Sequence, residues 1–159
     1  MFELTPIREM DWPIACSLIV EAREWSTRSD TFVPPMAVLS HPDSKWYSAF
    51  QNNELAGIVG FHGISWIDGT AEMFTALVPD KRGKGLPVSL VKHQLGVGFK
   101  ELGFIKITMM TLEGSPSAAI ADHLKIRKEG VFPLARLKQG NRPTALAYGI
   151  FRGEYDALP

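Results

Sequence analysis

The chain has 159 residues, of which 45% are hydrophobic, and its 17 basic and 17 acidic residues leave no formal net charge. This composition predicts one globular domain over residues 1–159, and the balanced charge argues against whole-molecule attraction to nucleic acid. A single cysteine, Cys16, excludes an internal disulfide, and no Cys/His cluster has zinc-ligand spacing, so we expect a reducing, cytoplasmic compartment and no metal. No apolar run approaches about 18 residues and no signal-peptide pattern opens the sequence, so neither membrane insertion nor secretion is expected.

The first third of the chain predicts a strand, a helix and a long connection. Residues 2–7 alternate as an edge strand, and a helix follows from Asp11, its expected cap, to Trp25. Residues 26–45 contain three prolines and no sustained period, which predicts a loop with one short helix near residues 36–39. Long loops in compact domains are often functional, so we place acceptor recognition in residues 26–45; a passive packed connection is the alternative.

The middle of the chain predicts a meander of three antiparallel strands. Residues 46–51 and 54–65 form a hairpin around Asn52 and Asn53, because asparagine tolerates the left-handed conformation of tight turns. Asp68-Gly69 marks the next turn, and residues 71–78 form the third strand.

The remaining elements predict a crossover unit followed by a strand pair. An apolar stripe over residues 87–102 indicates a helix, and its Gly96 and Gly98 indicate close packing on the sheet or a frayed last turn. The strand at residues 104–111 completes a βαβ unit and is therefore parallel to the strand at residues 71–78. Ser115-Pro116 begins a shorter helix, and residues 131–138 and 144–151 read as the closing strands.

A basic, glycine-rich stretch joins the third strand to the long helix: Val78-Pro79-Asp80-Lys81-Arg82-Gly83-Lys84-Gly85-Leu86-Pro87. Glycines let successive backbone N–H groups point inward, and a helix start carries a partial positive charge, so this turn is suited to binding phosphate. Arg82 and Lys84 add cations for a pyrophosphate. A surface turn with solvated cations is the alternative.

This stretch resembles the acetyl-CoA loop of the GNAT superfamily of N-acetyltransferases, whose pattern is Gln/Arg-x-x-Gly-x-Gly/Ala. Arg82 and Gly85 match its first and fourth positions, whereas Pro87 replaces the last and has no N–H to donate. A second similarity covers residues 112–130, where Ser-Pro-Ser-Ala and Leu-Lys-Ile-Arg-Lys-Glu-Gly are similar to another segment of these enzymes, with Ser115, Lys125 and Ile126 in place of Asn, Gly and Phe.

The resemblance implies an α/β (α+β) GNAT fold: a mixed, mostly antiparallel sheet of six to seven strands, helices on both faces, and a V-shaped split between the fourth and fifth strands. It also implies acetyl-CoA as co-substrate. Free backbone groups near Leu77 and Val78 would pair with the pantetheine amides, and the turn would hold the pyrophosphate. The residues that the resemblance places on the cofactor are Leu77, Val78, Arg82, Gly83, Lys84, Gly85 and Leu86.

The catalytic assignments are Glu72 and Ser115. Glu72 is the only acid on its strand and resembles the carboxylate that takes the amine's proton in many GNATs, directly or through water; a solvent-facing glutamate is the alternative. The tyrosine that many members use as general acid falls at Ala121, which leaves Ser115, His123 or a water.

His62 faces the acceptor or is structural. Trp25, Trp46 and Trp66 form an acceptor wall or belong to the core.

Three hypotheses follow for the function. The first is N-acetylation of a primary amine on a small molecule or protein. The second is a catalytically inactive GNAT-fold module that binds acyl-CoA or a protein partner, favoured by Pro87 and the missing tyrosine. The third, a nucleic-acid-associated regulator acting through the basic C-terminal third, is opposed by the zero net charge. A homodimer is compatible with the sequence, which does not identify the acceptor.

Overall fold

In the computed structural model of the chain, residues 1–25, 34–83, 85–134 and 137–159 are described, and they form one sheet flanked by helices. The seven strands have the order β1-β2-β3-β4-β5-β7-β6. Every neighbouring pair is antiparallel except β4 and β5, which are parallel. The strands are β1 Phe2–Pro6, β2 Lys45–Gln51, β3 Glu54–Ser65, β4 Thr70–Leu77, β5 Lys106–Leu112, β6 Arg127–Phe132 and β7 Ala145–Phe151.

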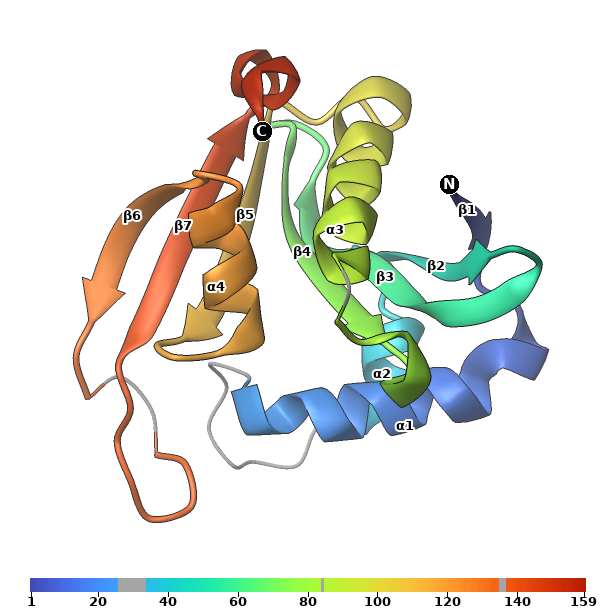
Figure 1. Cartoon of the computed structure of the whole chain (residues 1–159), viewed down its shortest axis with the longest axis horizontal. Helices are drawn as coiled ribbons and strands as arrows, with labels where there is room; N and C mark the ends of the chain where they lie inside the picture. The colour runs from blue at the N-terminus through green and yellow to red at the C-terminus, as the bar shows by residue number, and fades with distance from the viewer. Residues whose placement is uncertain (26–33, 84, 135–136) are drawn as a thin grey trace.

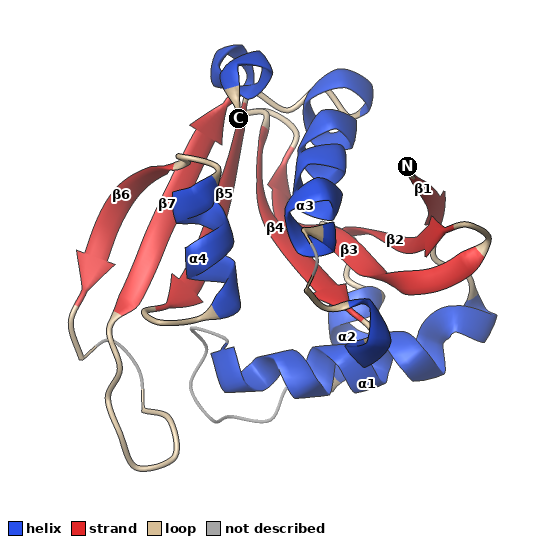
Figure 2. Ribbon diagram, viewed as in Figure 1, coloured by secondary structure: helices blue, strands red, loops and turns tan. Residues whose placement is uncertain are grey.

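The helices lie where the sequence predicts them. They are α1 Trp12–Ala22, α2 Pro35–Leu39, α3 Leu86–Gly96 and α4 Pro116–His123. Helices α3 and α4 pack on one face of the sheet, around the cluster that contains Leu95, Ala121 and Tyr148. Helices α1 and α2 pack on the opposite face around Leu18, Leu39 and Trp46. Figure 2 shows α3 and α4 in front of the sheet, with α1 crossing its lower end.

The β2–β3 hairpin and the βαβ crossover confirm two predictions made from local chemistry. Asn52 and Asn53 both have positive φ, 52° and 63°, as the two-residue turn requires. Helix α3 carries the chain from β4 to β5, and this is the one connection that joins parallel strands in the sheet.

The end of α3 explains its glycines. The helix continues into a π-helical turn at Val97–Glu101, and a Cβ on Gly98 would lie 2.6 Å from Ile107 and 3.0 Å from Phe61. Close packing on the sheet, one of the two predicted reasons, is therefore the reason for Gly98.

The predicted bounds of one closing strand are wrong. Strand β6 spans Arg127–Phe132 and not residues 131–138. Its first half is charged and its pairing with β7 shifts between Lys128 and Gly130, so it lacks the alternation that identifies a half-buried strand. Gln139 and Gly140 instead form a tight turn between the bridged residues Lys138 and Asn141.

The predicted split lies between β4 and β5. Their parallel pairing covers only Thr70 with Lys106, Ala71 with Ile107 and Glu72 with Thr108, although β4 continues to Leu77 and β5 to Leu112. Figure 1 shows the two strands close together at one end and separated at the other, where α1 crosses. The fold class predicted from sequence is confirmed.

Candidate functional site

The open half of β4 presents backbone groups toward β5. The N–H of Val78 donates to the carbonyl of Ala56 at 2.9 Å, so this end of β4 remains bonded to β3. Because antiparallel pairs alternate between hydrogen-bonded and non-hydrogen-bonded, Leu77, opposite Gly57, turns its own N–H and C=O toward the split. Of the two residues expected to offer free backbone groups, only Leu77 is so oriented; the N–H of Val78 is already bonded.

A fully buried glutamine fixes β4 just beyond the point where it leaves β5. Gln94 of α3 donates from Nε2 to the carbonyls of Gly60 at 2.8 Å and Phe74 at 3.1 Å, and its Oε1 accepts from the Thr75 hydroxyl at 2.5 Å. Sequence reasoning missed Gln94, whose only signal is a polar residue on the apolar stripe of its helix. These bonds tie α3 to the antiparallel pair of β3 and β4 at Gly60 and Phe74, just beyond the last residue of β4 that pairs with β5.

The turn after β4 holds two glycines in the left-handed conformation. Gly83 and Gly85 have φ of 89° and 74°, and Gly85 is the N-cap of α3 with no side-chain cap. A Cβ at either glycine would meet nothing within 4 Å, so the conformation and not crowding requires glycine. The N–H of Leu86 is used by the carbonyl of Gly83 at 3.1 Å, and Pro87 has none. Lys84 lies outside the described residues.

The cations of this turn are already paired in the described structure. Arg82 donates from Nε and Nη2 to the carbonyl of Leu77 at 3.1 and 3.0 Å, and from Nη1 to Glu21 at 2.5 Å. The hydrogen bond from Arg82 lowers the pKa of Glu21 and, in return, raises the pKa of Arg82. Lys81 pairs with Glu54 at 2.7 Å. A ligand phosphate therefore has to replace these partners.

Glu72 lies at the junction of the two strands, on the face covered by α1 and α2. Its strand partners are His62 on β3 and Thr108 on β5, and its carboxylate is 3.9 Å from His62 Nε2. The Glu72 side chain is 36% exposed and that of His62 is 20% exposed. Thr75 points to the opposite face, toward Gln94, as the strand alternation predicts.

An aromatic wall adjoins Glu72 and His62. The ring of Trp46 stacks on that of His62 with centroids 6.5 Å apart, and Phe74 meets Trp46 edge-on at 5.5 Å. Gly60 makes room for the indole, because a Cβ there would lie 2.3 Å from it. Sequence reasoning missed Phe74, although its position two residues after Glu72 places both on one face.

The predicted wall of three tryptophans is not assembled. Trp66 is 55% exposed in the turn after β3 and packs against Phe104, in the core under α3. The side chain of Trp25 and residues 26–33, most of the segment predicted to border the acceptor, lie outside the described part of the chain. Within that part, Trp46 belongs to the core under α1 and α2, which was the alternative expectation, and His62 and Phe74 lie beside it.

Ser115 caps helix α4 and is buried. Its hydroxyl accepts from the N–H of Ala118 at 3.0 Å and is hydrogen-bonded to Thr111 at 2.7 Å.

The three tyrosines, all within the described residues, have other partners: Tyr148 donates to Asp122, Tyr155 donates to the carbonyl of Lys92, and Tyr47 packs in the core under α3. Burial and the Asp122 carboxylate raise the pKa of Tyr148 to about 12.

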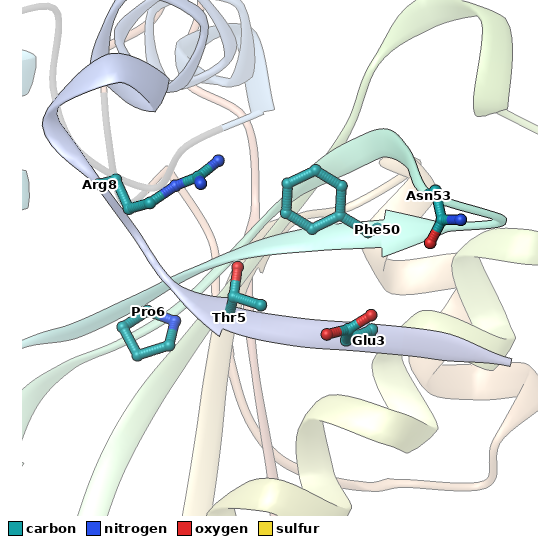
Figure 3. A pocket seen from close by; sticks show the side chains of 6 residues that line it. All are labelled: Glu3, Thr5, Pro6, Arg8, Phe50 and Asn53. Atoms are coloured by element: carbon teal, nitrogen blue, oxygen red, sulfur yellow. The ribbon is translucent and has the colours of Figure 1, made fainter.

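The described surface also contains two hollows that do not include Glu72 or the glycine turn. One, of about 600 Å³, lies on β1 and β2 (Figure 3); it is lined by Glu3, Thr5, Pro6, Arg8, Phe50 and Asn53. The other, of about 210 Å³, lies between the end of α4 and the C-terminus. Across the described residues, no three His, Cys, Asp or Glu side chains cluster as a metal site, and none of the helices there is long and apolar enough to span a membrane.

The sheet order, the parallel β4–β5 junction that opens after three residue pairs, and the glycine turn at the start of α3 define the GNAT fold. No family model matches the sequence, and no curated protein matches it significantly. Solved structures do match: spermidine N-acetyltransferase from Vibrio cholerae, in complex with CoA and spermine, superposes with a TM-score of 0.84 over 97% of both chains at 17% identity.

Two further structures of the Vibrio cholerae enzyme give the same result. Mutant forms of the spermidine/spermine N-acetyltransferase SpeG match with a TM-score of 0.83 over 98% of this chain and 96% of theirs, at 17% identity. The complex with manganese ions matches with a TM-score of 0.80 over 98% and 95%, at 16% identity. At these identities the similarity establishes the fold of this chain.

Proposed function

We propose that this protein is an acetyl-CoA-dependent N-acetyltransferase that acts on a primary amine. The observation that supports the proposal most is the split itself: β4 leaves β5 after Glu72, and a glycine turn at a helix start lies at the open end. These are the two features that a CoA thioester needs, an unpaired strand edge for its amides and backbone N–H groups for its diphosphate.

The cofactor site consists of the end of β4 and the turn. The backbone of Leu77, the last residue of β4, faces the pantetheine arm, Val78 follows it, and Arg82 with the N–H groups of the glycine turn surrounds the diphosphate. Pro87 removes one donor from the first turn of α3, so binding relies on the remaining N–H groups and on the cations Arg82 and Lys84.

Glu72 is the base in this proposal. It accepts a proton from the acceptor ammonium, directly or through water, so that the amine nitrogen attacks the thioester carbonyl carbon. An N–C bond forms and the C–S bond breaks. The second proton, which the nitrogen loses as it becomes an amide, passes through Ser115 or water to the leaving thiolate, so that the relay group ends as it began. Ser115 has a proton to give only while Thr111 is the donor of the hydrogen bond between the two hydroxyls.

The acceptor in this proposal is an amine-bearing molecule whose ammonium group approaches the partly exposed Glu72 beside the rings of His62 and Phe74. A carboxylate beside aromatic rings favours an alkylammonium group, which the carboxylate and the ring faces both attract. Since the solved structures with this fold include spermidine acetyltransferases, spermidine is the first amine to test. Protein N-termini and lysine peptides are the next.

The test measures CoA thiol release with a panel of amines, together with calorimetry for CoA. We expect Glu72→Gln to lower kcat at least about a hundredfold, the low end of what a general base contributes, and to leave CoA affinity unchanged. Glu3→Gln, a change of the same charge on the edge strand β1, is the control. Unchanged turnover in Glu72→Gln would remove the base assignment, and absence of CoA binding would remove the enzyme proposal.

A catalytically inactive module that binds acyl-CoA remains the second candidate, because Pro87 lacks a donor and each tyrosine is engaged away from the junction. CoA binding without thiol release from any amine would favour it. Pro87→Gly should tighten CoA binding in both cases.

A further inference from the structure

Two protein groups hold the arginine of the glycine turn where a ligand diphosphate is expected. The guanidinium of Arg82 donates from Nε and Nη2 to the carbonyl of Leu77, and from Nη1 to the carboxylate of Glu21 at 2.5 Å. The side chains of Arg82 and Glu21 are 45% and 48% exposed, so an incoming ligand can reach both. Three directed donors of the guanidinium are thus occupied before any ligand arrives.

Both partners of Arg82, the carbonyl of Leu77 and the carboxylate of Glu21, lie along the expected path of CoA. The carbonyl of Leu77 faces the split, beside the expected path of the pantetheine arm. Glu21 lies in the last turn of α1, which crosses the open end of the split (Figure 1). A carboxylate and a diphosphate are both anions that bind a guanidinium through paired N–H donors, so they compete for Arg82.

We propose that Glu21 is a positioning residue that acts through Arg82 and sets the affinity for CoA; this inference rests on the proposed function. In the free protein Glu21 and Leu77 hold the guanidinium, and CoA binds only as its diphosphate displaces the carboxylate. Removing the Glu21 charge therefore increases the affinity for CoA, whereas removing Arg82 decreases it and makes Glu21 irrelevant.

The chain offers a matched control in the other ion pair of the turn. Lys81 pairs with Glu54 at 2.7 Å, and Glu54 begins β3. Glu54→Gln removes the same charge from an exposed partner of a neighbouring cation and leaves the contacts of Arg82 intact. This control distinguishes two causes of tighter binding. One is that Arg82 is freed from Glu21, and the other is that the loss of any negative charge weakens the repulsion between the protein and the polyanionic CoA.

The experiment is calorimetry of the full chain with CoA and with inorganic pyrophosphate. It compares the wild type with Glu21→Gln, Glu54→Gln, Arg82→Gln and the double variant of Glu21 and Arg82. We expect Glu21→Gln to bind both ligands about two- to fivefold more tightly, the range for an exposed ion pair, and Glu54→Gln to match the wild type. Glu21→Gln should also lower KM for acetyl-CoA with kcat unchanged.

The double variant decides whether Glu21 acts through Arg82. In the Arg82→Gln background, Glu21→Gln should leave CoA affinity unchanged. The inference is overturned if Glu21→Gln does not tighten CoA binding, if Glu54→Gln tightens it equally, or if the gain persists without Arg82. Wild-type binding with no gain in Glu21→Gln removes only this inference; no CoA binding in either protein removes the proposed function as well.

Discussion

The sheet consists of two arms, and the interactions that join the arms differ from those that join the strands within each arm. The N-terminal arm, β1 to β4, and the C-terminal arm, β5 to β7, each consist of antiparallel strands paired over most of their length. Between the arms only three residue pairs connect β4 to β5. Backbone hydrogen bonds therefore organise each arm, and something else has to join the two.

Side-chain packing on one face joins the arms. The cluster under α3 and α4 contains residues of both arms, including Phe61 and Met73 on one side and Ile107 and Tyr148 on the other. The clusters around Leu90 and Leu18 contain strand residues of the N-terminal arm alone. Because apolar packing is non-directional, it holds the arms together without using the polar backbone groups of the split. Of these groups, the carbonyl of Leu77 accepts from Arg82.

The largest loss of stability is expected where β3 supports the open half of β4. A Cβ on Gly57 would lie 2.1 Å from the carbonyl oxygen of Ala76 and 2.8 Å from the Cα of Leu77, both backbone atoms of β4. Gly57→Ala should therefore separate β3 from the open half of β4 and destabilise the protein by about 3 kcal/mol, measured by urea unfolding.

Gly153→Ala is the control for this change. Its added Cβ would meet nothing within 4 Å, so we expect a change within about 0.5 kcal/mol. A cost below about 1 kcal/mol for Gly57→Ala would mean that β4 shifts freely and does not depend on β3 for its path.

A smaller effect is expected where α3 supports β4. Gln94→Leu removes two donors from the carbonyls of Gly60 and Phe74 and takes the partner of the half-buried Thr75 hydroxyl away, at a cost of about 2 kcal/mol in the free energy of unfolding. Adding Thr75→Val removes that unpaired hydroxyl. The double variant should thus lose less than the sum of the two single changes. Additive costs would show that the two side chains do not act as one unit.

The smallest effect concerns the C-terminal arm and alkaline pH. Burial and the bond to Asp122 raise the pKa of Tyr148 from 10.0 to about 12, so the folded state holds this proton more tightly than the unfolded state does. The stability from this bond is complete below pH 10 and is lost as pH rises toward 12, about 1 kcal/mol by pH 11. Unfolding free energies from about pH 9 to about pH 11 should fall less steeply in Tyr148→Phe.

Tyr155→Phe provides the matched comparison, because its hydroxyl bonds to the backbone carbonyl of Lys92 in α3 and not to a carboxylate. It should keep the alkaline loss of the wild type. An equal slope in Tyr148→Phe and the wild type would show that the Asp122 bond does not link the stability of the C-terminal arm to pH.

The sequence predicted most elements because each has a strong local signal. Asn52-Asn53, Ser115-Pro116 and the glycine turn are positions where backbone conformation restricts the residue type, and the structure has turns or helix starts at each. The bounds of strand β6 were predicted wrongly because the strand has no such local signal. Its charged residues serve cross-strand ion pairs, such as Glu129 with Lys106 at 2.7 Å, which periodicity does not reveal.

The candidate site was predictable only where the backbone defines it. The turn from Arg82 to Leu86 and the place of Glu72 on β4 followed from motif and alternation, and their roles remain proposals. Gln94, Phe74 and Glu21 were missed, because their parts depend on neighbours distant in sequence. The bond of Val78 to Ala56 was missed for the same reason.

By itself the sequence determined the order of elements, the parallel crossover and the glycine turn, because helix caps, alternation and positive φ are properties of adjacent residues. Only the tertiary structure decided how far β4 and β5 stay paired, which rings stand beside Glu72, and that Arg82 binds Glu21 and Leu77. These depend on which surfaces pack against each other in the folded chain, and no local pattern specifies that choice.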